Sequence, residues 1–303
     1  MLKNALITGV NGFTGPYVKE ALLQQGLVVY GTSFKKSNDP HILQTDLRIP
    51  DSIEHTVNQV NPDIVIHLAG SACPAVQDID KIFSANAVCT FNLLKSLHDL
   101  RKKPESILIC STAHVYSTKN THDFLETSPI EPLSYYAKSK LVVESIAKTW
   151  EKKLPITTIR PFNYTGPGQT NRYLIPKIVD HYARRKETIA LGNLDISRDY
   201  SDVRTVSEVY AKLAQTAHPG EIFNICSGKS HTLHQIIELM NAIAGYEIDI
   251  TTSKDHIRSN DIKQICGSNQ KLKDSIGTFS EIPLHETLRW MYQHRIAELE
   301  STP

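Results

Sequence analysis

The sequence predicts an α/β fold: a Rossmann-type doubly wound parallel sheet with a smaller α/β C-terminal substrate domain. Two observations lead to this fold class. Short apolar runs suited to buried strands alternate four times with amphipathic segments suited to helices, which indicates a parallel sheet covered on both faces. The first apolar run also ends in a glycine-rich turn that opens a helix. Because ligands of such sheets bind outside the carboxyl ends of the strands, we expect the site there.

The first strand is expected at Leu2–Thr8, and it is followed by T-G-V-N-G-F-T-G with glycines at Gly9, Gly12 and Gly15. An amphipathic helix then runs to about Gln25. Glycines at this point permit a tight turn and close approach of the backbone to a pyrophosphate, and the helix N-terminus supplies N–H groups. The spacing is G-x-x-G-x-x-G, and its strand–turn–helix context predicts a dinucleotide site.

The end of the second strand, Leu27–Thr32, bears on the choice of dinucleotide. NAD-binding folds usually place an acid there for the ribose hydroxyls. This chain has no acid but reads G-T-S-F-K-K, with Ser33, Lys35 and Lys36. The pattern favours a 2′-phosphate and therefore NADP(H), with NAD(H) left open. Asp46 follows a short run and suits a contact with the adenine edge.

Further elements are expected as a helix at Ile53–Val60, a strand at Ile64–Ala69, a mostly helical segment at Ile79–Leu100 and a strand at Ser106–Cys110. His67 precedes the end of its strand, so we expect it to be packed rather than catalytic.

Tyr136-x-x-x-Lys140 supplies the proposed chemistry. On a helix, these positions lie one turn apart on the same face. The ammonium is expected to favour the phenolate and to lower the Tyr136 pKa from about 10. Such a phenol can exchange a proton with a substrate oxygen. Thr112 follows a strand end, so its hydroxyl is expected to meet the phenol beside a nicotinamide.

Composition narrows the possible partners and compartment. The chain has 303 residues, is 40% hydrophobic and 21% charged, and has a net charge of +1. Since no block of charge is present, no nucleic-acid or membrane partner is expected. No signal peptide or membrane-spanning run is recognised. The five cysteines lack C-x-x-C spacing, which argues against a disulfide framework or zinc site and favours a reduced, cytoplasmic protein.

Together, the glycine turn, the H-L-A segment at 67–69, Thr112 before V-Y, and Tyr136 with Lys140 resemble the extended short-chain dehydrogenase/reductase superfamily. The resemblance implies that Thr112 and Tyr136 bind the reacting oxygen and that Lys140 holds the nicotinamide ribose. It also implies a homodimer built from the helices near Asn86 and Tyr136. The residues assigned to the cofactor are Gly9, Asn11, Gly12, Phe13, Gly15, Ser33, Lys35, Asp46, Leu47, Leu68, Ala69, Gly70, Asn86, Tyr136, Lys140 and Pro161.

The second half of the chain resembles nucleotide-sugar enzymes acting on GDP-mannose derivatives, most of all GDP-6-deoxy-D-mannose reductases. The matching segments are 160–169, 191–203, 223–229 and 258–272. The resemblance implies a cofactor domain of residues 1–163 plus 203–226 and a substrate domain of 164–202 plus 227–303. It assigns these residues to a GDP-sugar: Thr112, His114, Asn163, Lys177, Leu191, Asn193, Arg198 and Arg258.

The residues after Thr112 help to choose the reaction. Sugar 4,6-dehydratases carry an acid there, whereas this chain has Ala113 and His114. Relatives that epimerise before reduction carry Cys at the position of His114 and a His in the segment matching Asn171–Pro176, which here has none. We therefore expect NAD(P)H-dependent reduction of the C4 keto group of GDP-4-keto-6-deoxy-D-mannose to GDP-D-rhamnose. GDP-6-deoxy-D-talose as product, a UDP- or dTDP-sugar 4-epimerase with tightly bound NAD, and the role of His114 stay open.

Overall fold

The computed structural model describes residues 2–71, 78–117, 123–194, 196–252 and 264–301. Within these ranges, seven strands form one parallel sheet in the order β3-β2-β1-β4-β5-β6-β10. The strand order reverses between β1 and β4, which is the point where sheets of this kind bind their ligands. The strands are β1 (Asn4–Thr8), β2 (Val28–Ser33), β3 (Ile42–Gln44), β4 (Ile64–His67), β5 (Ser106–Cys110), β6 (Ile156–Pro161) and β10 (Ile222–Ile225).

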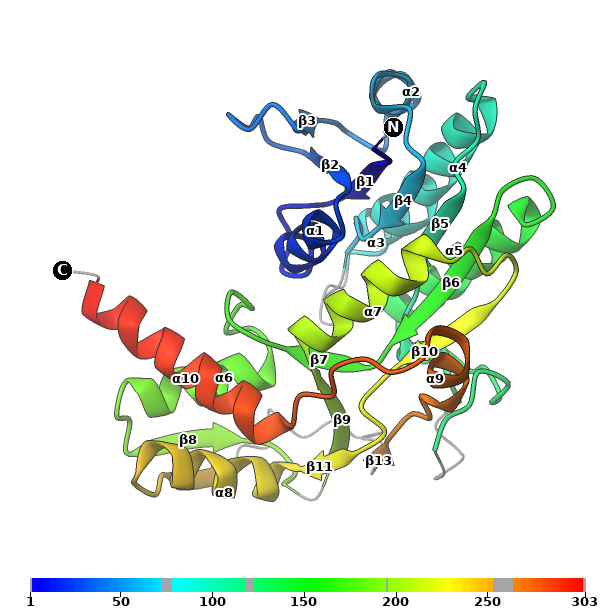
Figure 1. Ribbon diagram of the computed structural model, residues 1–303. Coiled ribbons are helices and arrows are strands. Elements are labelled where there is room, and N and C mark those ends of the chain that lie inside the picture. The colour runs from blue at the N-terminus through cyan, green and yellow to red at the C-terminus, as the bar shows by residue number, and fades with distance from the viewer. Residues whose placement is uncertain (1, 72–77, 118–122, 195, 253–263, 302–303) are drawn as a thin grey trace.

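Helices cover both faces of this sheet, which confirms the predicted fold class. α1 (Gly15–Gln24) and α7 (Val203–Gln215) lie against one face, as Figure 1 shows. α2 (Pro50–Val60), α4 (Cys89–Asp99) and α5 (Tyr135–Trp150) pack against the other. The central strands are apolar almost throughout because both of their faces are buried.

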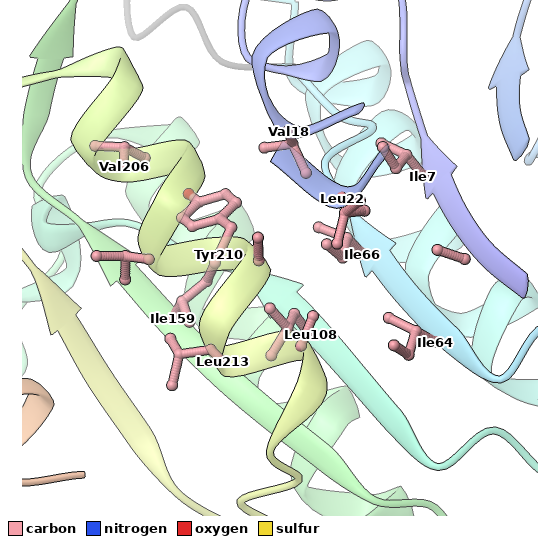
Figure 2. Packing of buried hydrophobic residues seen from close by; sticks show 14 of the residues in the cluster. Ile7, Val18, Leu22, Ile64, Ile66, Leu108, Ile159, Val206, Tyr210 and Leu213 are labelled. Carbon is pink, nitrogen blue, oxygen red and sulfur yellow. The ribbon is translucent and has the colours of Figure 1, made fainter. Parts of the chain in front are cut away.

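Figure 2 shows how the face covered by α1 and α7 is packed. Side chains of both helices point onto apolar residues of the central strands, so the two helices and the sheet share one core. Those from the helices are Val18, Leu22, Val206, Tyr210 and Leu213, and those from the strands include Ile7, Ile64, Ile66, Leu108 and Ile159.

Two smaller sheets accompany the large one (Figure 1). In the described residues, β7 (Asn163–Thr165), β9 (Ser197–Asp202), β11 (Ser230–Thr232) and β13 (Gln264–Ile265) form one sheet, and β8 (Thr188–Leu191) pairs with β12 (Asp249–Thr252). A third apolar cluster lies among α6 (Leu174–Ala183), α8 (Leu233–Ala244) and α10 (Leu284–Ser301). The short α9 (Gln270–Ile276) packs against β10. β10 is a strand of the large sheet, and α7 packs on its face. The domain boundaries at 163, 202 and 226 stay a prediction.

Most element positions agree with the sequence pattern to within one to three residues. The segment expected as mostly helical is divided into α3 (Ile79–Phe83), a π-helical turn (Ser84–Val88) and α4. Among the described helices, none is both long and apolar enough to cross a membrane. The four described cysteines are free, and the described residues contain no cluster suited to a metal ion.

His67 lies at the end of β4, buried between its two neighbours. Its Nδ1 is 2.7 Å from the Thr8 hydroxyl, and its Nε2 is 3.0 Å from the Thr90 hydroxyl. Thr90 in turn donates to the Asn86 carbonyl at 2.6 Å, which leaves its oxygen to accept from Nε2–H. Burial lowers the pKa of His67 to about 3. The residue is therefore a neutral packing group, as expected.

We predict that His67 makes the protein less stable in mild acid. The pKa of His67 is depressed in the folded state. Below about pH 6.5 the His67 imidazole therefore binds a proton in the unfolded chain but stays neutral in the folded chain. Stability is complete above pH 6.5 and falls by roughly 2 kcal/mol between pH 6.5 and 5. Urea unfolding of the parent and His67→Gln at several pH values measures this effect. An equally steep pH dependence in both proteins would contradict it.

Candidate active site

The turn after β1 leaves no room for side chains. Gly9 has a φ of +71°, and a Cβ added to it would lie 2.9 Å from the Cα of Ala69 in the loop after β4. A Cβ on Gly15 would lie 2.1 Å from the Val10 carbonyl oxygen. At Gly9 the turn contacts the loop after β4, and at Gly15 it contacts its own backbone at Val10. Glycine is therefore required at both positions.

The N-terminus of α1 is suited to an anion. Its N-cap residue, Thr14, makes no capping hydrogen bond, and its first turn carries no acid. The Thr14 hydroxyl is instead 2.7 Å from the Tyr164 hydroxyl, and the Phe13 ring stacks on Tyr164 at 5.8 Å. The first amides of a helix have no partner within it, and they lie at the positive end of its dipole. This arrangement fits the pyrophosphate of a dinucleotide.

The end of β2 carries hydroxyl and amine groups in place of a carboxylate. Ser33 is buried, and its hydroxyl oxygen accepts from the Asn11 side chain at 3.0 Å and from the Lys35 amide at 3.1 Å. The side chains of Lys35 and Lys36 are exposed. No acid occurs between residues 28 and 36, so nothing in that segment would repel a 2′-phosphate.

Asp46 is held by its neighbour. Arg48 donates to both carboxylate oxygens of Asp46, at 2.9 and 2.7 Å, and these bonds keep the pKa of Asp46 below its ordinary value. The Arg48 guanidinium also lies 5.3 Å from the centre of the Phe34 ring. Leu47 beside Asp46 is buried.

Asn86 connects the loop after β4 to α5. Its side-chain oxygen accepts from the Ser71 amide at 2.8 Å, and its nitrogen donates to the Ser139 hydroxyl at 2.8 Å. A Cβ on Gly70 would lie 2.5 Å from the Asn86 oxygen and 3.5 Å from the Lys140 nitrogen. Asn86 thus fixes the loop that contains Leu68–Gly70 beside α5.

Thr112 and Tyr136 are brought together, as the sequence predicts. Thr112 follows β5 and caps the 3₁₀ turn Ala113–Val115, and its oxygen accepts the His114 amide at 3.3 Å. Tyr136 lies in the first turn of α5, whose N-cap residue is Ser134. Both side chains are buried, and Thr112 lies close enough to Tyr136 to lower the pKa of its phenol. Because the Thr112 oxygen already accepts an amide, its hydroxyl hydrogen is available to the phenol oxygen.

The prediction that Lys140 lowers the pKa of Tyr136 is wrong, because that pKa is raised in this structure. Burial raises the pKa of Tyr136, the nearby Cys110 raises it further, and only the bond from Thr112 lowers it. The Lys140 amine, one helical turn away, donates to the Cys110 carbonyl at 2.9 Å. Burial also lowers the pKa of Lys140 itself. Removal of the phenol from water therefore dominates its pKa, and Tyr136 is protonated at neutral pH.

Two aromatic residues accompany Tyr136. The exposed His114 has its ring 6.2 Å from that of Tyr136 in an edge-to-face arrangement. Tyr173 lies close enough to raise the pKa of both Tyr136 and Tyr164. Tyr164 and Tyr173 are not predictable as neighbours of this site, because neither stands in a spacing that points to the glycine turn or to α5.

The residues assigned to a GDP-sugar are distributed over several elements of the second half. The Asn163 side chain donates to the Asp199 carbonyl at 3.3 Å, Lys177 to the Ala190 carbonyl at 3.0 Å, and Arg198 to the Ser197 carbonyl at 2.8 Å. Leu191 is buried in β8, Asn193 is exposed after it, and Pro161 is buried at the end of β6. Arg258 lies outside the described residues.

A model of the NAD dependent epimerase/dehydratase family matches residues 5–226. The chain belongs to this family. Family membership, together with the seven-stranded sheet and the glycine turn, makes it an enzyme that uses a nicotinamide dinucleotide and confirms the resemblance to extended short-chain dehydrogenases/reductases.

Curated relatives of this family member match along nearly the whole chain. It is 31% identical to the GDP-6-deoxy-D-mannose reductase of Pseudomonas aeruginosa, over 95% of this chain and 96% of the relative. It is 29% identical to the GDP-6-deoxy-D-talose 4-dehydrogenase of Aggregatibacter actinomycetemcomitans, over 97% of this chain and 98% of the relative.

Solved structures agree with this assignment. RMD from Pseudomonas aeruginosa, solved with NADPH, is 28% identical, with a TM-score of 0.87, and covers 98% of this chain and 99% of its own. A putative epimerase from Burkholderia cenocepacia is 40% identical, with a TM-score of 0.93, and covers 97% and 98%.

We predict that Gly9→Ala impairs cofactor binding and that Gly245→Ala does not. Both glycines have φ values above +70°, but a Cβ on Gly245 meets nothing within 4 Å. The control therefore carries only the backbone strain, about 1 kcal/mol, whereas Gly9→Ala also displaces the loop at Ala69. NADPH affinity measured by fluorescence should fall about tenfold or more in Gly9→Ala and stay unchanged in Gly245→Ala. Equal affinities in the two variants would contradict the assignment of the turn.

Proposed function

We propose that the protein is a reductase that transfers hydride from NADPH to the C4 keto group of GDP-4-keto-6-deoxy-D-mannose and forms GDP-D-rhamnose. The observation that carries the proposal is the close approach of the buried Thr112 and Tyr136 side chains. These two hydroxyl groups lie at the carboxyl edge of the sheet that also bears the glycine turn. Two full-length relatives named for 4-reduction or 4-dehydrogenation of GDP-6-deoxy sugars support the substrate class.

In this mechanism, the C4 keto oxygen of the substrate binds next to the hydroxyl groups of Thr112 and Tyr136. When bound, the nicotinamide supplies the hydride that converts the C4 carbonyl into an alkoxide. The Tyr136 phenol donates its proton to that oxygen, and Thr112 stabilises the developing charge with a hydrogen bond. Lys140 holds the ribose from one helical turn below. We therefore assign Thr112, Tyr136 and Lys140 as the catalytic residues.

The protonation state of Tyr136 favours reduction. Burial raises its pKa, so the phenol carries the proton that an alkoxide needs. Oxidation of the alcohol requires the phenolate, which the same burial disfavours. A carboxylate for dehydration is missing beside Thr112, where Ala113 and His114 stand. These features favour a ketoreductase over a dehydratase.

The cofactor and substrate contacts follow the same reasoning. We assign the 2′-phosphate of NADPH to Ser33 and Lys35, because no acid lies near the end of β2. The GDP-sugar is assigned to the substrate domain of residues 164–202 and 227–303. In this domain, Lys177 and Arg198 are the positively charged residues assigned to bind it. A guanidinium matches phosphate oxygens well, which favours Arg198 for the diphosphate.

GDP-6-deoxy-D-talose is the second candidate product. It is favoured by the similarity to the talose 4-dehydrogenase, at 29% identity. The two products differ only in the face of C4 that receives the hydride. NMR of the product formed from the ketosugar and NADPH distinguishes them. Failure of the protein to oxidise NADPH with this ketosugar, together with isomerisation of a sugar nucleotide on retained NAD, would contradict the reductase and favour a 4-epimerase.

We predict that Tyr136→Phe lowers kcat for the ketosugar by roughly 10²- to 10⁴-fold, because it removes the proton donor. Tyr135→Phe is the matched control, since this neighbouring phenol is half exposed at the start of the same helix. NADPH oxidation followed at saturating ketosugar gives kcat for both variants. Equal rates for Tyr136→Phe and the parent would remove the phenol from the mechanism.

We also propose a homodimer formed through α4 and α5. This surface exposes Val88, Phe91, Tyr135 and Val142, each with 38% or more of its area accessible. Burial of such a surface in a second copy is favourable because it removes apolar area from water.

Phe91→Asp should therefore shift the protein from dimer to monomer in sedimentation velocity. Leu23→Asp, on the exposed side of α1, should leave the dimer intact. A monomeric parent protein would rule the dimer out.

A further inference from the structure

A buried ion pair lies directly beneath the catalytic residues. Glu144 is one helical turn beyond Lys140 on α5, and Arg160 lies on β6. Arg160 Nη2 donates to Glu144 Oε2 at 2.7 Å and Nε donates to Oε1 at 2.8 Å. Their side chains are only 5% and 9% exposed. The cost of removing two charges from water offsets most of their attraction, so the pair adds little to the stability of the fold. A contribution to stability therefore does not explain its presence.

The Glu144 carboxylate has a third partner next to the site. The Ser111 hydroxyl donates to Glu144 Oε1 at 2.5 Å, and the Ser111 amide donates to the Ile159 carbonyl at 2.8 Å. Ser111 immediately precedes Thr112. The chain is therefore fixed to the ion pair one residue before Thr112.

Arg160 holds the same segment from its other end. Its Nη1 donates to the Tyr116 hydroxyl at 3.1 Å and to the Glu126 carbonyl at 3.1 Å. Tyr116 follows the 3₁₀ turn that Thr112 caps, and its hydroxyl donates to Asn224 Oδ1 at 2.6 Å. Thr112 thus lies between two anchors, at Ser111 and Tyr116, which both bond to one ion pair.

The pair also joins the elements that carry the two hydroxyls. Glu144 belongs to the helix of Tyr136, whereas Ser111 belongs to the segment of Thr112 after β5. Figure 1 shows α5, β5 and β6 as separate elements of the large domain. A charge-assisted contact between them fixes the distance between the two hydroxyls more tightly than apolar packing alone, because its bonds are short and directional.

We propose that Glu144, with Arg160, is a positioning residue that holds the Thr112 hydroxyl against the Tyr136 phenol through Ser111. The inference rests on the proposed function only in that Thr112 and Tyr136 act on the same oxygen. Ser111→Ala is its cleanest test, because it cuts the link to Thr112 and leaves the ion pair intact. Glu144→Gln is the second variant, since it keeps the shape but removes the charge.

Thr287→Val provides the matched control. The Thr287 hydroxyl donates at 2.7 Å to Asp202, a fully buried carboxylate that is likewise paired with an arginine, Arg204. This pair lies between α10 and the start of α7. The control therefore removes the same kind of hydrogen bond from a place without catalytic residues.

We expect Ser111→Ala to lower kcat about tenfold, with KM for NADPH and for the sugar changed less than twofold. Thr287→Val should keep kcat within twofold for a comparable fall in melting temperature. Thr112 lowers the Tyr136 pKa, so its displacement in Ser111→Ala should move the pH for half-maximal kcat in the oxidation direction upward. Glu144→Gln should change kcat and pH profile in the same direction.

Hydrogen–deuterium exchange gives a readout without substrate. Residues 111–116 should exchange faster in Ser111→Ala and Glu144→Gln than in the parent and in Thr287→Val. Unchanged exchange there, or a normal kcat and pH profile with only a lower melting temperature, would overturn the positioning role. A parent protein inactive with the GDP-ketosugar counts against the proposed function instead. The exchange measurement then still decides the positioning role.

Discussion

The alignment of strand ends in the parallel sheet is the constraint on which the site depends. Register pairs Thr8 with His67 and His67 with Ile109, so β1, β4 and β5 terminate almost level with one another. The glycine turn, the Leu68–Gly70 loop and the segment leading to Thr112 therefore leave the sheet side by side. A shift of one residue in any strand would turn its side chains to the opposite face and separate these groups.

A chain of buried hydrogen bonds reinforces that edge. The Ala69 amide donates to the Thr8 hydroxyl, which bonds to His67, and His67 bonds through Thr90 to the Asn86 carbonyl. The Asn86 side chain continues through the Ser139 hydroxyl, which donates to the Tyr136 carbonyl at 2.7 Å. The Leu68–Gly70 loop is thus connected to the Tyr136 backbone without a gap. A buried polar path of this kind is favourable only because every member has a partner.

Local patterns in the sequence were sufficient for the fold and for placing Tyr136 and Lys140 one turn apart on one helix. Gly9 and Gly15 stand between a strand and a helix, and the i, i+4 spacing of Tyr136 and Lys140 needs only one helix. The pKa of Tyr136 was not predictable in this way, because it depends on how much protein covers the phenol. The contact of Glu144 with Arg160 was also hidden, since it requires knowledge of which strand lies under α5. The spacing does indicate that Glu144 lies on the same helix face as Tyr136 and Lys140, because the three residues are four positions apart.

The return of α7 and β10 to the large sheet has a consequence during synthesis. A nascent chain of 163 residues already contains six of the seven strands of the large sheet but not the helix whose Tyr210 and Leu213 cover Leu108 and Ile159. Until the ribosome has released about sixty further residues, that face of the sheet stays open to water and to neighbouring chains. Completion of the large sheet and its helical cover therefore waits for the translation of residues 164–202, and the incomplete chain is prone to aggregation through its exposed apolar face.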